Sequence, residues 1–333
     1  MYLIAETAWH HDGDFLFFKD LVQAISEKTS TDFIKFHITL DVDEYMHTDH
    51  PAYNWAKERI FSEKQWNEIF NIALDYNKKL MLLFNDRKAV DFGMTYNPEL
   101  VEIHSVCLND IKLLNHLKSK ISNETVVVLG IGGTDLYEVE HAVEIIESEN
   151  ILLMHGFQNY PTKYEDINFS KIRKIMKLYP RFKHGYADHT AWDNENNILI
   201  TLFGAALGMD FIEKHVSTAI GSGRTDWQAA VSIDRFNEIQ KNLKVLSVAN
   251  GDGLLKMNEG ERSYSTFGAM KKAAILNRDV KKGEHLSLND FDFKRTGQGS
   301  DLSQLEAIKN LNKVFSKDFS KGHCLSKIDL QEL

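Results

Sequence analysis

Eight short apolar segments recur along the first two thirds of the chain, and segments with helical periodicity lie between them. The apolar segments are residues 2–6, 33–37, 79–84, 100–105, 125–131, 151–156, 182–188 and 210–215. Continuous apolar runs are typical of strands that are buried on both faces of a parallel sheet. Eight such strands alternating with helices predict an α/β fold, a (β/α)8 TIM barrel. A doubly wound open sheet is the alternative.

Helical periodicity is clearest in three of the intervening segments, at 14–28, 62–77 and 135–148, where apolar residues recur every three or four positions. The segment 41–61, after the second strand, lacks this pattern, and we predict a long loop there that acts as a lid. Its histidines and aspartates are assigned to the lid and not to a metal site.

The character of the sequence changes after residue 247. Residues 248–268 are polar and punctuated by glycine, which indicates a linker, and residues 269–333 contain short strand-like pieces separated by turns. We therefore predict a barrel domain at 1–247 and a small, mostly β module at 269–333. No internal repeat is evident in the sequence.

Charge and composition argue against several classes of protein. The net charge of −9 does not suit a nucleic-acid-binding protein, because neutralising phosphates requires clustered lysine and arginine. No apolar run approaches the roughly 20 residues that span a bilayer, and the opening residues lack the pattern of a signal peptide. The two cysteines, Cys107 and Cys324, make no disulfide framework. We expect a cytoplasmic protein that acts on small molecules, with no nucleic-acid or membrane partner.

Polar side chains gather where the predicted strands end, which is the end of a TIM barrel that carries the active site. They are Glu6, His10, His11, Lys35, His37, His155, Gln158, Tyr160, Asp188, His189, Glu213, Lys214 and His215. Imidazoles and carboxylates at one barrel mouth indicate a divalent-metal site. His189 and His215 end adjacent strands and are the predicted ligand pair, which His155 or a carboxylate could complete. Mn²⁺, Zn²⁺ and Fe²⁺ all suit such ligands.

The glycine-rich run GIGG at 130–133 follows the fifth strand and precedes a helix. Such a turn exposes backbone N–H groups, which can hold an anion. A tight turn without a ligand is the favoured interpretation, and the anion site is its alternative.

Six segments stand out as possible motifs, namely IAETAWHHDGD (4–14), FIKFH (33–37), HGFQNYP (155–161), GYADHT (185–190), FIEKHVS (211–217) and KRTGQG (294–299). These segments resemble motifs of the sialic acid synthase family. The last one resembles a motif of the small antifreeze-like (SAF) domain that these enzymes carry. The resemblance runs in register over nearly the whole chain.

The resemblance implies that phosphoenolpyruvate is joined to an N-acyl hexosamine such as N-acetylmannosamine, giving a nonulosonic acid and phosphate. It implies that Glu6, Lys35 and His215 are catalytic and that His189 and His215 hold Mn²⁺ or Mg²⁺. The implied substrate-binding residues are His37, Ser105, Gln158, Tyr160, Asp188, Lys214, Asp226 and Arg295. Of these, Tyr160 and Asp226 would hold the sugar, and Arg295 would reach the N-acyl group from the partner chain of a domain-swapped homodimer.

The chain departs from the family pattern on the phosphate side. Glu102 stands where the family has a lysine, and Gly130 and Ala187 stand where it has serines. Each lost donor would cost about 1–3 kcal/mol of binding if nothing replaced it. Two alternatives therefore stay open. One is a metal-dependent aldol-type or isomerase enzyme acting on a non-phosphorylated oxoacid or sugar acid, and the other is a sugar-binding or regulatory protein without turnover.

Overall fold

The computed structural model describes residues 1–156, 159 and 161–332. Gln158 and Tyr160, which the resemblance assigns to substrate binding, lie outside the described residues. The chain divides into two compact units, Met1–Gly251 and Asp252–Leu333. Each unit has its own core.

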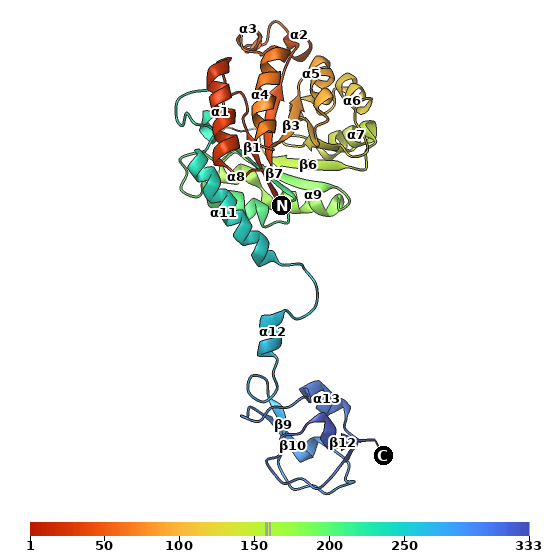
Figure 1. Ribbon diagram of the computed structural model, residues 1–333. Coiled ribbons are helices and arrows are strands. Elements are labelled where there is room, and N and C mark those ends of the chain that lie inside the picture. Colours follow the sequence, from red (N-terminus) through yellow and green to blue (C-terminus); the bar gives the residue numbers. More distant parts are fainter. Residues whose placement is uncertain (157–158, 160, 333) are drawn as a thin grey trace. The chain divides into compact units, whose positions relative to one another are not determined.

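The described residues of the first unit form a closed barrel of eight parallel strands, paired in the order of the sequence (Figure 1). The strands are β1 (Tyr2–Glu6), β2 (Phe33–Ile38), β3 (Lys79–Phe84), β4 (Leu100–Ile103), β5 (Val126–Gly130), β6 (Ile151–Gly156), β7 (Lys183–Asp188) and β8 (Phe211–His215). The barrel closes because β1 pairs with β8, with Glu6 opposite His215. This closure confirms the predicted TIM barrel and excludes the open sheet.

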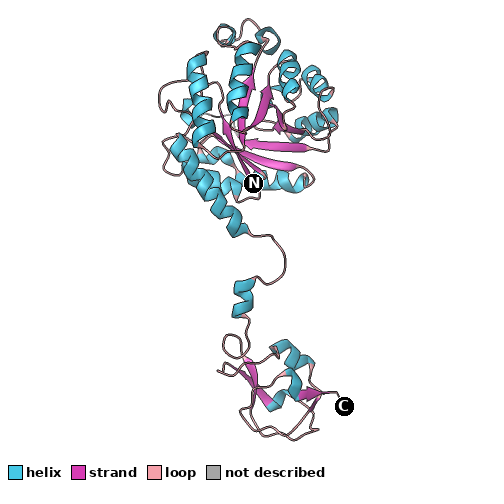
Figure 2. Cartoon of the chain, in the orientation of Figure 1, coloured by secondary structure: helices cyan, strands magenta, loops and turns pink. Residues whose placement is uncertain are grey.

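Helices surround the barrel strands (Figure 2). They are α1 (Phe15–Lys28), α2 (Val42–Tyr45), α3 (Tyr53–Lys57), α4 (Glu63–Asp75), α5 (Arg87–Gly93), α6 (Ile111–Lys118), α7 (Leu136–Ile146), α8 (Tyr164–Ile167), α9 (Phe169–Leu178), α10 (Asn197–Ala205) and α11 (Ile233–Asn250). The three helices expected from periodicity are confirmed as α1, α4 and α7. Each begins after a residue, Asp14, Ser62 or Asp135, whose side chain accepts a hydrogen bond from a first-turn backbone N–H.

Successive residues of each strand face opposite sides of the barrel wall, and this alternation decides which side chains reach the interior. On β8, Phe211, Glu213 and His215 face inward, whereas Ile212 packs in the outer core against the helices. Lys214 shares the outer face with Ile212. The apolar side chains inside the barrel are Ile4, Phe33, Met81, Leu100, Val126, Val128, Leu152, Met154, Ala187 and Phe211.

The segment 41–61 differs from the predicted loop, because it contains the helices α2 and α3. These helices have only four and five residues, too few to show an apolar period in the sequence. A small core holds the segment together. It consists of Val42, Tyr53 and Ala56, with Trp9, Met46, Trp55 and Ile60 packed against them.

The second unit contains two short antiparallel sheets. Its strands and helices are α12 (Glu259–Tyr264), β9 (Ala273–Leu276), β10 (Phe291–Lys294), α13 (Gln304–Lys309), β11 (Val314–Phe315) and β12 (Leu330–Gln331). β9 pairs with β10, and β11 pairs with β12.

The second unit also contains an internal repeat, so the prediction that the chain has none is wrong. Residues 279–290 and 318–329 share an aspartate, a Lys-Gly pair, a Leu-Ser pair and a final aspartate in the same order. Asp279 accepts a hydrogen bond from the backbone N–H of Lys321 at 2.7 Å. Asp318 accepts a bond of 2.9 Å from the backbone of the first repeat in return. The repeat is hard to recognise in the sequence because most of the shared residues belong to turns and form no apolar pattern.

No helix in the described part of the chain is both long and apolar enough to cross a membrane. Both cysteines are free and buried. Burial raises the pKa of the Cys107 thiol to about 12, which keeps it protonated and unreactive.

Candidate active site at the barrel mouth

A polar cavity opens at the carboxyl ends of the barrel strands. Among the described residues, it is lined by Glu6, Lys35, His37, Glu102, His104, Gly130, Gly132, Met154, Gly156, Ala187, His189, Glu213 and His215. The structure thus brings together six of the strand-end residues singled out from the sequence, namely Glu6, Lys35, His37, His189, Glu213 and His215. It adds Glu102, which the sequence marks only as a departure from the family pattern.

Lys35 is enclosed by three carboxylates inside the barrel. Its Nζ atom lies 2.7 Å from Glu102 Oε2, 2.9 Å from Glu6 Oε2 and 3.0 Å from Glu213 Oε2, and all four side chains are at most 4% exposed. Burial alone would lower the pKa of Lys35, but the charges of the three glutamates raise it well above its ordinary value. Lys35 therefore stays protonated, and the neighbouring glutamates offset its positive charge.

The two glutamates on either side of the barrel seam differ in protonation. Burial raises the pKa of Glu213 well above its ordinary value, which favours the protonated acid. Burial also opposes ionisation of Glu6, but the charges of Lys35 and His37 outweigh it and lower the pKa of Glu6 well below its ordinary value. Glu6 is thus an ionised carboxylate, and its Oε1 atom accepts the Ala8 N–H at 2.8 Å and lies 3.0 Å from His37 Nε2.

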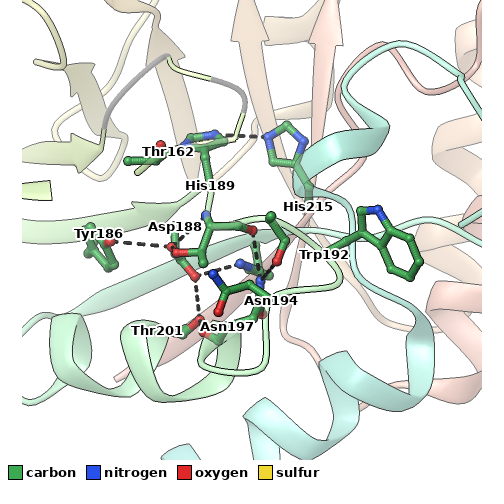
Figure 3. Close-up of polar contacts among 12 residues, drawn as sticks. Thr162, Tyr186, Asp188, His189, Trp192, Asn194, Asn197, Thr201 and His215 are labelled. Atoms are coloured by element: carbon green, nitrogen blue, oxygen red, sulfur yellow. Dashed lines mark hydrogen bonds and ion pairs between the residues drawn. The ribbon is translucent and has the colours of Figure 1, made fainter. Parts of the chain in front are cut away.

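His189 and His215 meet at the mouth (Figure 3), where their Nε2 atoms lie 3.2 Å apart. Their ring centroids are 4.8 Å apart with planes at 74°. Burial lowers the pKa of His189 to about 4 and that of His215 well below its ordinary value. Both imidazoles are therefore neutral at pH 7, which is the form that binds metal ions.

This pair fits a divalent metal. Imidazole nitrogens lie about 2.1 Å from a bound transition ion, so two ligands at roughly tetrahedral or octahedral angles stand about 3.0–3.4 Å apart. The observed 3.2 Å lies within that interval. Among the described residues, however, no group of three histidine, cysteine or acidic side chains is arranged to hold an ion.

Asp188 and Lys214 neighbour the two histidines in sequence but face the other side of the barrel wall. Lys214 Nζ lies 2.6 Å from Asp188 Oδ2, and both side chains are fully buried. Asp188 also accepts a hydrogen bond from Thr190. It accepts another from Thr201 of α10 (Figure 3). This differs from the expected substrate contacts: the pair anchors the strand ends that carry His189 and His215. The reason is the alternation of side chains along β7 and β8.

His155 also faces outward, so it does not complete the shell of the histidine pair as the sequence suggested. Its Nε2 atom lies 3.0 Å from His184 Nδ1, on the outer side of β6 and β7. Ser105 begins a short 3-10 helix (Ser105–Cys107) beside the cavity but does not line it. A Cβ atom at Gly130 would come within 2.9 Å of the Ser105 backbone nitrogen, which explains the glycine at that position.

The remaining predicted site residues lie on loops or in the second unit. Asp226 follows β8 with a left-handed backbone (φ 62°), and burial raises its pKa. Arg295 belongs to the second unit, where its guanidinium donates two hydrogen bonds to the carbonyl of Ala269 at 2.9 and 2.6 Å.

His10 received no role from the sequence, yet the structure buries it completely beside His215. Its Nδ1 atom lies 2.6 Å from the carbonyl oxygen of Thr225. Arg224 reinforces this link between the loops after β1 and β8, because its guanidinium donates to the carbonyls of His10 and His11. Burial lowers the pKa of His10, so this ring is neutral as well.

A second cavity adjoins the first and shares Gly132, Gly156 and Ala187 with it. It lies beside the glycine-rich turn predicted as a possible anion site, and Thr134 and Lys171 line it. The backbone of this turn is therefore accessible from a cavity, which keeps the anion interpretation open as a prediction.

Residues 25–254 match the model of the NeuB family. The chain belongs to the NeuB family. This confirms the resemblance to sialic acid synthases found in the sequence, at a distance that makes the chain a divergent member.

Its NeuB relatives cover nearly all of the chain. An uncharacterized protein of Methanocaldococcus jannaschii is 28% identical over 316 residues, covering 93% of this chain and 89% of the relative. The N,N'-diacetyllegionaminic acid synthase of Legionella pneumophila is 24% identical over 327 residues, covering 92% and 88%. The human N-acetylneuraminate-9-phosphate synthase is 22% identical over 306 residues, covering 88% and 82%.

Solved structures share the fold. The putative spore coat polysaccharide biosynthesis protein E of Chromobacterium violaceum superposes with a TM-score of 0.82 at 19% identity, covering 99% of this chain and 100% of that one. The N-acetylneuraminic acid synthetase of Leptospira borgpetersenii superposes with a TM-score of 0.71 at 23% identity, covering 79% and 89%.

Proposed function

We propose that this NeuB chain condenses phosphoenolpyruvate with an N-acyl hexosamine in a metal-dependent reaction that yields a nonulosonic acid and phosphate. The proposal rests on one observation: four strands bring Glu6, Lys35, His189 and His215 to the lining of one cavity. The relatives named above as synthases of legionaminic and neuraminic acids support this class of reaction.

In this reaction the methylene carbon of phosphoenolpyruvate attacks the aldehyde carbon of the open sugar, water adds to the adjacent carbon, and phosphate leaves. Glu6 suits the role of proton acceptor from that water, because it is ionised and its orientation is fixed by Ala8 and His37. Lys35 stabilises the negative charge of Glu6. When bound by His189 and His215, a divalent metal such as Mn²⁺ or Mg²⁺ supplies Lewis-acid polarisation of the sugar carbonyl.

The direct test mixes the metal-loaded protein with phosphoenolpyruvate and a panel of N-acyl hexosamines and measures phosphate release and product mass. Glu6→Gln should reduce turnover strongly while leaving the fold intact, because glutamine keeps the acceptor for the Ala8 N–H. No phosphate release with any sugar of the panel would contradict the proposal.

We further propose that the second unit is an SAF module and that the chain forms a domain-swapped homodimer in which Arg295 reaches the partner's site. Mixing two inactive variants, Glu6→Gln and Arg295→Ala, tests the exchange. In a swapped dimer, one of the two sites of a mixed dimer has both residues intact, so activity returns. If mixed dimers form and stay inactive, the exchange is absent.

A second candidate function uses a non-phosphorylated oxoacid or sugar acid as the anionic substrate. The observation that favours it is the contact of Lys35 Nζ with Glu6 and Glu102, because their carboxylates offset the positive charge that would otherwise attract a phosphate dianion. Competition between pyruvate and phosphoenolpyruvate for the metal-loaded protein discriminates the two functions. Tight binding of phosphoenolpyruvate over pyruvate would remove this candidate.

A further inference from the structure

His10 has one imidazole nitrogen that is buried without a hydrogen-bond partner among the described residues. The side chain is 0% exposed, and its Nε2 atom makes no hydrogen bond within the part of the chain that the structure describes. Burying an unsatisfied polar atom costs about 1–3 kcal/mol, so such an atom in a native protein calls for a physical explanation. A histidine whose Nε2 lone pair serves as a metal ligand has this arrangement.

The other nitrogen of His10 fixes which tautomer is present. A carbonyl oxygen can only accept, so the 2.6 Å contact with Thr225 requires that His10 Nδ1 carries the proton. The lone pair of the neutral ring then lies on Nε2. Metal-binding histidines characteristically donate their second ring N–H to a carbonyl or carboxylate in this way. His10 is therefore oriented like a histidine that binds metal.

The barrel topology brings His10 to the same place as the two histidines already described. β7, β8 and β1 are adjacent strands; His189 directly follows β7, His215 is the last residue of β8, and His10 lies four residues after the end of β1. The ring of His10 lies 5.4 Å from that of His215 with planes at 73°. The corresponding values for His189 and His215 are 4.8 Å and 74°. The two ring pairs thus have nearly the same geometry, with His10 slightly farther out.

We propose that His10 is a third imidazole ligand of the metal centre at this barrel mouth, with its Nε2 atom closing onto the ion when the ion binds. The proposal rests on the two-histidine centre of the proposed function. Three neutral nitrogen donors prefer Zn²⁺, Fe²⁺, Co²⁺ or Mn²⁺ over Mg²⁺, which takes oxygen ligands. The centre therefore selects a transition metal.

The test measures metal binding by the full-length, untagged, metal-stripped protein in the absence of substrates. Co²⁺ is titrated while its visible d–d bands are recorded, and the dissociation constant is taken from the titration. His10→Asn should weaken Co²⁺ binding by more than about tenfold and change the bands, since loss of an outer partner alone typically costs about 10–100-fold. His189→Asn is the positive control, and His141→Asn, on the exposed face of α7, is the matched control.

Unchanged Co²⁺ affinity and unchanged bands in folded His10→Asn would overturn the proposal. If, in addition, the KM for the sugar rises, His10 contacts substrate and not metal. Mg²⁺ binding as tight as Zn²⁺ binding would also contradict it. Because the metal titrations need no turnover, they separate this proposal from the condensation reaction: His10-dependent metal binding without a nonulosonic product would leave the metal site standing and remove only the reaction. Circular dichroism of the metal-free variants confirms that they fold.

Discussion

The Nζ atom of Lys35 lies 2.7 Å from Oε2 of Glu102, the shortest of its contacts with the surrounding carboxylates. Glu102 occupies the position at which the sialic acid synthase motif has a lysine. Where the resemblance implies a positive charge, this chain therefore has a carboxylate beside Lys35. The inner end of the cavity is thus less favourable for a phosphate dianion.

Glu102→Gln tests this relationship, because it removes one negative charge and keeps the shape of the side chain. We expect the KM for phosphoenolpyruvate to fall by about tenfold or more, since two unit charges about 4 Å apart interact by roughly 4 kcal/mol at an effective dielectric constant of 20. Steady-state kinetics and inhibition by inorganic phosphate measure the change.

Glu213→Gln is the matched control for that experiment. Burial raises the pKa of Glu213 and favours its protonated form, so an amide in its place should change the affinity for phosphoenolpyruvate less than Glu102→Gln does. Equal effects of the two substitutions, or no effect of Glu102→Gln, would contradict the assigned roles.

Lys35→Met should destabilise the barrel strongly. It leaves Glu6 and Glu102 buried without their cation, and removing one partner of a buried ion pair typically costs about 3–5 kcal/mol. Urea unfolding followed by circular dichroism measures the loss in the free energy of unfolding. Adding Glu102→Gln to Lys35→Met should recover part of it, and a double variant no more stable than the single one would argue against the ion pair as the cause.

The fold could be predicted because each barrel strand is buried on both faces and therefore reads as a continuous apolar run. The short helices α2 and α3 could not be predicted, because a helix of about one turn is too short to show apolar residues recurring every three or four positions. The repeat of the second unit was missed for a related reason. Its signal lies in turn residues such as Asp279 and Asp318, whose reciprocal hydrogen bonds are visible only in three dimensions.

The site was predictable only in part. Strand ends indicate which residues reach the barrel mouth, and His189 and His215 do meet there. The face of each side chain depends on strand register, so Asp188 and Lys214 look equivalent to their neighbours in the sequence but pack outside the wall. The contact between Lys35 and Glu102 joins β2 to β4 inside the closed barrel, which the sequence does not specify.

Acid should destabilise the first unit through His155. Burial, with the nearby charges of His184 and Lys171, lowers its pKa to about 3, against about 6.5 in an unfolded chain. The unfolded state then binds more protons between these values, so stability is full above pH 6.5 and is lost as pH falls towards 3. Roughly 2 kcal/mol should be lost by about pH 5. Urea unfolding at several pH values measures the slope, which His155→Gln should flatten; an unchanged slope in this variant would show that other groups cause the loss.

The two hydrogen bonds that link the repeats of the second unit should each protect one backbone amide from hydrogen exchange. Asp318→Ala removes the acceptor of the Lys282 amide, and Asp279→Ala removes that of the Lys321 amide. Because a typical hydrogen bond contributes about 0.5–1.5 kcal/mol, each substitution should speed exchange of its own amide by up to about tenfold. Hydrogen exchange of the full-length protein, read by NMR, measures both amides. Asp292→Ala, which removes only an exposed pair with Lys294, is the control and should change neither amide. If either variant accelerates exchange equally throughout the second unit, the bonds hold the whole unit together and not the two turns separately.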